Sequence, residues 1–170
     1  MALDLLKLLL FPTLMTFAAS SDLLTMTISN RLSLALVAAF AVLAVADGMS
    51  LTAIGWHIGA AALVLAATFV FFVRGWIGGG DAKLAAATTL WFGFDYLPEY
   101  LIYASLFGGA LTLLLIQFRL FPLPLMLARQ EWVARLHQKG GGVPYGIALA
   151  AAALVIYPQT DWMAVFRIQF

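Results

Sequence analysis

The stretch LTAIGWHIGAAALVLAATFVFFV, residues Leu51–Val73, is an apolar run broken only by His57. A helix needs about 20 mostly apolar residues to cross the hydrocarbon core of a bilayer. The run is long enough, so it predicts a membrane-spanning helix. We expect His57 to be a neutral, hydrogen-bonded side chain within the helix packing rather than part of a proton relay.

The composition of the whole chain agrees with this prediction. Of its 170 residues, 64% are hydrophobic and only 10% are charged, whereas roughly a quarter are charged in an ordinary soluble domain. A soluble globular enzyme and a disordered tail are therefore excluded. The net charge of +1 gives no attraction to nucleic acid. The chain has no cysteine, which excludes disulfides, thiolate zinc sites and a cysteine nucleophile.

Five further apolar runs flank the first one, and we predict six transmembrane helices in a single domain, 1–170. The other five predicted spans are 5–23, 31–47, 82–95, 97–118 and 143–158. The span 82–95 is short, so we expect a tilted or partly buried helix there. The fold class is an all-α integral membrane protein with six transmembrane helices and one cytoplasmic amphipathic helix.

Basic residues set the expected orientation, because they collect on the cytoplasmic side. The connections after the first, third and fifth spans carry seven of them: Arg31, Arg74, Lys83, Arg119, Arg129, Arg135 and Lys139. The opposite side carries two, Lys7 and Arg167, together with most of the acidic residues. We therefore place the first group in the cytoplasm and both termini outside it.

The longest connection contains the predicted amphipathic helix. Pro122 and Pro124 end the preceding helix, and apolar residues then recur at helical spacing over 125–137. This pattern favours a helix lying on the inner headgroups. The predicted helix anchors the connection to the membrane surface or, alternatively, contacts a substrate.

Residues 1–20 allow one competing interpretation, a cleavable signal peptide, because small residues follow an apolar run. The leading region argues against it, since it holds Asp4 and only one basic residue, Lys7, and Pro12 interrupts the apolar run. We therefore expect residues 5–23 to be the first span.

Two aspartates stand out because they fall at one membrane depth. Asp22 lies near the cytoplasmic end of the first span, and Asp81 opens the fourth span directly after Gly78–Gly80. Intramembrane carboxylates are unfavourable and usually face a bundle interior or a wet cavity. When two carboxyl groups share a site, one tends to keep its proton. The ionised one can then activate water while the protonated one polarises a carbonyl. This is the chemistry of aspartic peptide hydrolysis, which needs no metal or cofactor.

The glycines before Asp81 have two interpretations. Without Cβ atoms, Gly78 and Gly80 let a substrate backbone approach closely, and they permit positive φ angles. The alternative is a glycine linker followed by Asp81 as the helix cap. A phosphate-binding loop is excluded, because no Lys-Ser/Thr pair follows Gly80.

Three sequence blocks resemble one protease family. Residues 78–84, Gly-Gly-Gly-Asp-Ala-Lys-Leu, are similar to the GxGD pattern of membrane aspartyl proteases. The block 22–31, DLLTMTISNR, resembles the first aspartate block of type IV prepilin peptidases, and 143–148, VPYGIA, is also similar to that family. The resemblance spans essentially the whole chain and is closest to the short six-span peptidases of tight-adherence (Flp) pilus systems.

This resemblance implies removal of a pilin leader at the cytoplasmic boundary of a bacterial inner membrane. It implies Asp22 and Asp81 as the catalytic pair and a prepilin, a leader followed by a hydrophobic helix, as the partner within the bilayer. Lys83 then tunes Asp81, holds a substrate carbonyl or serves as an inside-positive anchor.

The sequence also departs from the family pattern. Ser29 stands where the family usually has proline, which leaves Asn30 to cap or bond the turn after Asp22. The cysteine-bearing cytoplasmic domain of the long prepilin peptidases has no counterpart here, so the resemblance does not extend to their N-methyltransferase activity.

Two other functions use the same features. A proton- or cation-coupled transporter would place carboxylates near the midplane of a repeated fold, and a pilus assembly system could use the chain as a non-catalytic membrane subunit. The sequence shows neither a Ser/His pair on one side nor an HExxH motif, which argues against rhomboid-like serine proteases and metalloproteases.

Overall fold

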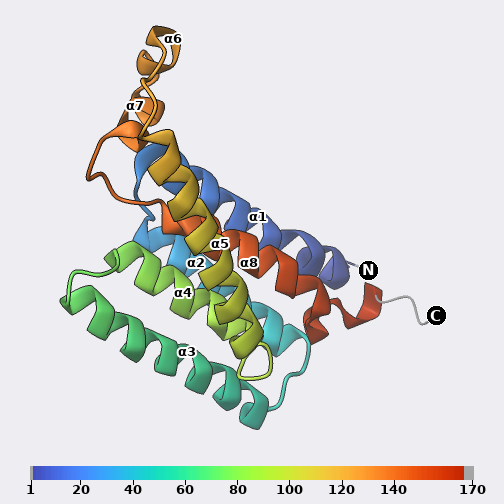
Figure 1. Cartoon of the computed structure of the whole chain (residues 1–170). Coiled ribbons are helices and arrows are strands. Elements are labelled where there is room, and N and C mark those ends of the chain that lie inside the picture. The colour runs from blue at the N-terminus through green and yellow to red at the C-terminus, as the bar shows by residue number, and fades with distance from the viewer. Residues whose placement is uncertain (1, 167–170) are drawn as a thin grey trace.

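The computed structural model describes residues 2–166 as a bundle of antiparallel helices joined by short connections (Figure 1). All of the regular elements in this range are helical. They are α1 (Ala2–Thr25), α2 (Asn30–Ala46), α3 (Leu51–Val73), α4 (Gly79–Phe92), α5 (Leu97–Phe118), α6 (Leu125–Ala128), α7 (Glu131–His137), α8 (Tyr145–Ile156) and two 3₁₀ turns, η1 (Tyr157–Gln159) and η2 (Asp161–Phe166). A helix is present at each of the six predicted spans.

The short fourth helix lies in the middle of the bundle. Ala82 and Leu84–Phe92 are all buried, and α4 packs against α2, α3 and α8. The prediction of a short, buried helix at this position is confirmed. Because α4 is surrounded, an ionisable residue in its first turn is held at a fixed position in the fold.

The interior of this bundle combines small residues, as is common between membrane helices, with large aromatic side chains, and many other large apolar residues are exposed. Ala150, Ala152 and Ala153 of α8 are fully buried, whereas Leu113 and Leu114 of α5 are 64% and 67% exposed. Within the described residues, α1, α3 and α5 are each long and apolar enough to cross a membrane, and α2 and α8 are shorter apolar helices.

The prediction of one continuous amphipathic helix over 125–137 is wrong. The segment forms two short helices, α6 and α7, separated at Gln130, whose backbone is extended. Only α7 contributes buried apolar side chains, and Leu125 is 85% exposed. The guanidinium groups of Arg135 and Arg119 donate to the backbone carbonyls of Leu24 and Leu136 respectively. These bonds hold α7 against the ends of α1 and α5. A straight helix that continued from α6 would not have this orientation.

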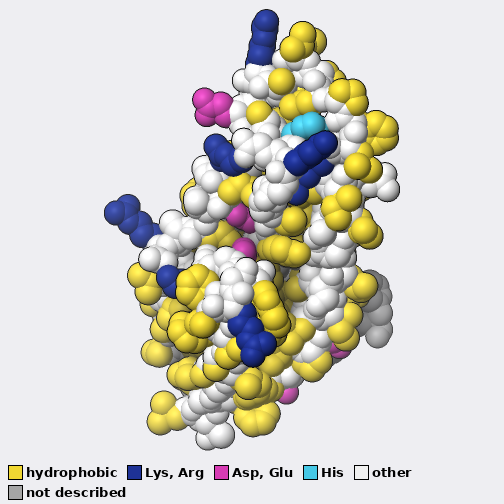
Figure 2. All heavy atoms as spheres, turned by 60° about the vertical axis from the view of Figure 1, so that its left-hand side comes forward, with side chains coloured by type: hydrophobic (Ala, Val, Ile, Leu, Met, Phe, Trp, Pro, Cys, Tyr) yellow, Lys and Arg dark blue, Asp and Glu magenta, His cyan; other side chains and the backbone are white. Residues whose placement is uncertain are grey.

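Basic side chains gather at one end of the bundle. The antiparallel arrangement brings the C-terminal ends of α1, α3 and α5 together with the start of α4. Figure 2, turned toward this end, shows Lys and Arg side chains spread over the face. The charge asymmetry expected from sequence is therefore present in the fold. Arg167, one of the two basic residues predicted for the other end, lies outside the described residues.

Candidate functional site

Asp22 is held in the last turns of α1 by the beginning of α8. Its side chain is only 4% exposed, and the backbone N–H of Gly146 donates to its Oδ2 atom at 2.7 Å. The first N–H groups of a helix have no partner within that helix, and a carboxylate at this end is favoured by the helix dipole. Asp22 therefore supplies to α8 the cap that the preceding Pro144 does not provide.

Asp81 lies in the first turn of α4, three residues after Gly78. Gly78 is the N-cap residue, and its backbone hydrogen-bonds the Asp81 carboxylate. This return of a side chain to the N-cap backbone is half of a capping box. A Cβ atom on Gly78 would lie 2.9 Å from Asp81 Oδ2, so a larger residue at this position would displace the Asp81 carboxylate.

Two details of the sequence prediction for this segment are wrong. The helix begins at Gly79, so Asp81 is inside the first turn and is not its cap. The glycines with positive φ among the described residues are Gly48, Gly75, Gly93 and Gly140, not Gly78 or Gly80. Close packing rather than backbone freedom explains the glycines before Asp81.

The two aspartates line one cavity of about 260 Å³. Its other walls are Gly78–Gly80 and the loop of Met26, Thr27 and Ile28 that joins α1 to α2. The carboxylates of Asp22 and Asp81 are close enough to interact electrostatically. Within residues 2–166 neither carboxylate forms an ion pair. The structure thus brings together, from residues 59 positions apart in the chain, the pair predicted from sequence.

Ile28 is a part of this site that sequence reasoning missed. A Cβ atom on Gly80 would lie 3.2 Å from Ile28 Cβ, and one on Gly146 would lie 2.8 Å from Ile28 Cδ1. Ile28 therefore lies between the beginnings of α4 and α8. Met26, just before it, has a positive φ of 55°, which is uncommon for a residue with a side chain. The turn that follows Asp22 therefore places Ile28 between the beginnings of α4 and α8.

Asn30 and Lys83 form a second polar pair beside the cavity. Lys83 Nζ donates to Asn30 Oδ1 at 2.9 Å and is exposed. The N-cap of α2 is Ser29, whose hydroxyl accepts from the Leu32 N–H. The expectation that Asn30 caps this turn is therefore wrong, because the serine in place of proline can do so itself.

His57 belongs to the other end of the bundle. Its Nδ1 atom lies 2.8 Å from the Leu90 carbonyl oxygen, and its ring packs on Phe40. The expectation of a hydrogen-bonded structural histidine is confirmed. Among residues 2–166, no three His, Asp or Glu side chains are grouped so that they could hold a metal ion.

Comparison with known families gives one match. The model of the type IV leader peptidase family matches residues 9–113 of the chain. The chain belongs to the type IV leader peptidase family. Members of this family are prepilin leader peptidases of the aspartic type, so the family favours the peptidase over the transporter and over the non-catalytic subunit. No curated protein and no solved structure is similar enough to count as a match.

The matched range of this leader peptidase contains both aspartates and the Asn30–Lys83 pair. It ends before Gly146, the residue whose N–H binds Asp22. The sequence offered a signal for this residue, because 143–148 is one of the three blocks that resemble prepilin peptidases. Its role as a ligand of Asp22 requires the three-dimensional fold.

Proposed function

We propose that this prepilin leader peptidase hydrolyses its substrate with Asp22 and Asp81 as a catalytic pair. The observation that carries the proposal is the shared cavity, which is lined by two carboxylates from different helices that have no neutralising cation among residues 2–166. Such an arrangement favours one proton shared between two carboxyl groups.

The reaction follows from this shared proton. The ionised carboxylate removes a proton from water as the water oxygen attacks the scissile carbonyl carbon. The protonated carboxyl group donates its proton to the carbonyl oxygen, and a tetrahedral intermediate forms. When the C–N bond breaks, the nitrogen takes the proton that the first carboxylate acquired, and the hydroxyl proton of the intermediate returns to the second. Both carboxyl groups then regain their starting states.

The glycines supply the surface on which the substrate lies. Gly78–Gly80 form one wall of the cavity and carry no side chain that would keep a peptide away from Asp81. Asp22 uses Oδ2 to accept the Gly146 N–H, which leaves Oδ1 available to the water. An extended substrate strand across the glycines would place its carbonyl between the two acids.

We further propose that the six helices at the predicted spans, α1 to α5 and α8, cross the bacterial inner membrane, with the catalytic cavity at the cytoplasmic boundary. The support is the collection of Lys and Arg side chains at the end that holds the cavity (Figure 2). Reporter fusions at Asp47 and Arg129 test this orientation, with Arg129 expected in the cytoplasm and Asp47 outside. The reverse result would contradict it.

The direct test is cleavage of a prepilin by the reconstituted protein. Asp22→Asn and Asp81→Asn should each remain inserted and folded but lose leader removal by at least about a hundredfold. Asp95→Asn, at the opposite end of the bundle, is the matched control and should retain activity. Full cleavage by either catalytic variant would refute the assignment.

A further inference from the structure

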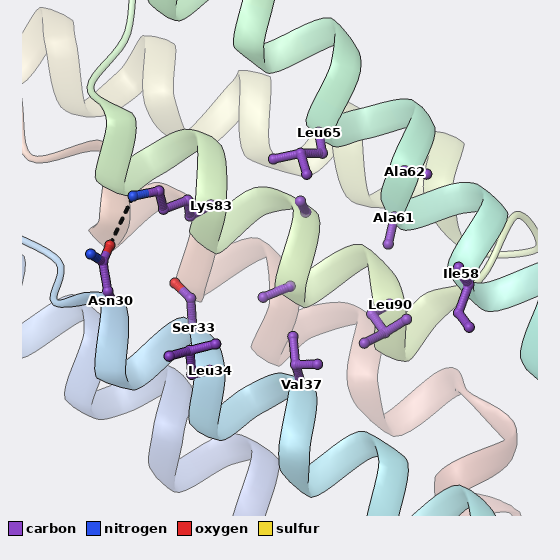
Figure 3. Close-up of a pocket in the computed structure, with 12 residues that line it drawn as sticks. Asn30, Ser33, Leu34, Val37, Ile58, Ala61, Ala62, Leu65, Lys83 and Leu90 are labelled. Carbon is purple, nitrogen blue, oxygen red and sulfur yellow. Dashed lines mark hydrogen bonds between the residues drawn. The ribbon is translucent and has the colours of Figure 1, made fainter.

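A long apolar groove runs along α4 between α2 and α3 (Figure 3). The cavity has a volume of about 600 Å³. Its floor includes the small side chains of Ala86 and Ala87 on α4, and its walls include Val37 of α2 and Ala61 and Leu65 of α3. The groove exists because α2 and α3 both pack on α4 and lie on either side of it (Figure 1).

One end of the groove is polar. It carries the Lys83–Asn30 hydrogen bond, and the hydroxyl of Ser33 points from α2 toward α4 (Figure 3). Ser33 is 9% exposed, and its hydroxyl has no hydrogen-bond partner among residues 2–166. The hydroxyl is closed off from solvent, so the accessible polar groups at this end of the groove are those of Lys83 and Asn30.

The polar end of the groove adjoins the two aspartates. Lys83 follows Asp81 by two residues on α4, and Asn30 follows Ile28 by two residues at the start of α2. Asp81 and Ile28 line the catalytic cavity, whereas Lys83 and Asn30 line the groove. The groove and the catalytic cavity therefore lie at the same end of α4 but on different faces of it, and a chain leaving the groove would reach the carboxylates by passing over the glycines at the start of this helix.

We propose that the groove binds the hydrophobic helix that follows the cleaved bond in the prepilin. This inference rests on the proposed function and extends it by naming where the uncleaved part of the substrate docks. Alanines in the floor let the backbone of a bound helix approach closely, as small residues do between membrane helices. At the polar end, the exposed Lys83 can donate to a carbonyl oxygen where that helix gives way to the extended strand that meets Asp81.

A lipid acyl chain is the competing occupant, and the position of the groove favours the substrate. A lipid acyl chain would contact the apolar walls but would make no use of the position of the groove at the same end of α4 as the catalytic cavity. A substrate helix placed there is held in register with the cleavage site, which converts binding into correct positioning of the reacting bond.

Filling the groove provides the first test. Ala61→Phe places a ring in the groove, and Ala67→Phe makes the same change at an exposed position of α3 that does not line it. Two substrates are compared: a full prepilin, and a peptide with the same leader and cleavage site but no hydrophobic helix. Ala61→Phe should lower kcat/KM for the full prepilin at least about tenfold and leave the shortened peptide unaffected, while Ala67→Phe should change neither. Equal losses on both substrates, or no loss on the full one, would overturn the proposal.

Cysteine cross-linking provides the second test, because the chain has no cysteine of its own. In an Asp81→Asn background, Val37→Cys should cross-link to a cysteine in the hydrophobic helix of the prepilin, whereas Leu113→Cys on the exposed face of α5 should not. Labelling of Val37→Cys by a photoactivatable lipid, with no substrate cross-link, would overturn the proposal in favour of a lipid groove.

The parent protein is assayed in parallel with both tests. If the parent cannot cleave the prepilin, the proposed function fails. If the parent cleaves the prepilin while the groove tests fail, only the groove assignment fails.

Discussion

The two ends of the bundle hold buried charge in opposite ways. At one end, Lys7 is 4% exposed and forms an ion pair with Asp47. The Tyr157 hydroxyl donates to the Lys7 carbonyl oxygen at 2.6 Å, and the Trp162 ring lies 6.0 Å from the Lys7 ammonium. At the other end, Asp22 and Asp81 line one cavity, and the hydrogen bonds to their carboxylates come from backbone groups.

We interpret this difference as one between a structural ion pair, Lys7 with Asp47, and a reactive pair of carboxyl groups, Asp22 with Asp81. A buried charge that meets its opposite is satisfied and contributes to one defined packing. Two carboxyl groups that share a cavity do not both ionise easily, and such groups are typical of catalytic sites. Removing charge should therefore lower stability at the Lys7 end and lower activity at the Asp22 end.

The largest effect is expected from lengthening a catalytic side chain while keeping its charge. Asp22→Glu and Asp81→Glu add one methylene group to a carboxylate whose position is set by Gly146 or Gly78. We expect about a hundredfold loss in the rate of leader removal, because an error of about 1 Å in a reacting group has that effect. Prepilin cleavage by reconstituted protein measures it, with Asp95→Glu as the control. Near-normal rates would show that the carboxylate positions are not critical.

Gly146→Ala should have the next largest effect. Its Cβ atom would lie 2.8 Å from both Asp22 Oδ2 and Ile28 Cδ1, so the carboxylate must move. We expect about a tenfold fall in cleavage rate. Gly109→Ala on α5 is the matched control, because a Cβ atom there meets nothing within 4 Å. Equal activity of the two variants would contradict the role of Gly146.

At the opposite end, Lys7→Met should lower stability and spare the chemistry. The change leaves the Asp47 carboxylate without its partner. The destabilisation should be below the roughly 3–5 kcal/mol of a fully buried broken pair, because the Asp47 side chain is 38% exposed. Thermal unfolding in detergent measures this loss, and the rate per folded molecule should remain near that of the parent. If adding Asp47→Asn to Lys7→Met restores stability, the loss is explained by the unpaired Asp47 carboxylate. An unchanged unfolding temperature in Lys7→Met would contradict a structural role for the ion pair.

Lys83→Gln should have the smallest effect. The side chain is exposed, and its bond to Asn30 is a single hydrogen bond to a charged group, worth about 1.5–3 kcal/mol at most. Glutamine can retain part of this bond, so we expect a fall of a few-fold in cleavage rate with little change in stability. A loss as large as that of the aspartate variants would place Lys83 within the reacting groups themselves.

The sequence was sufficient to predict the helices at the six apolar runs and the grouping of the two aspartates. Both follow from local properties, namely apolar runs of spanning length and the side on which each connection lies. The expectation of a tilted or partly buried α4 followed from its short length. The Lys7–Asp47 pair, by contrast, joins residues 40 positions apart, and the sequence indicated only that both lie at the same end.

What the sequence could not predict depends on packing between distant segments. Gly146 binds Asp22 because α8 begins where α1 ends, and Ile28 is enclosed by two glycines from other helices. The break between α6 and α7 likewise depends on Arg135 reaching the end of α1. No periodicity within these segments reveals such contacts.

The central claim is that α1 and α4 bring their two acidic positions together at one end of the bundle. The most direct measurement is cross-linking of Asp22→Cys with Asp81→Cys by a short bifunctional thiol reagent in membranes. The account predicts efficient intramolecular cross-linking for this pair and none for Asp22→Cys with Asp47→Cys, whose second position lies at the opposite end. Absence of cross-linking between positions 22 and 81, with both cysteines shown to be reactive, would contradict it.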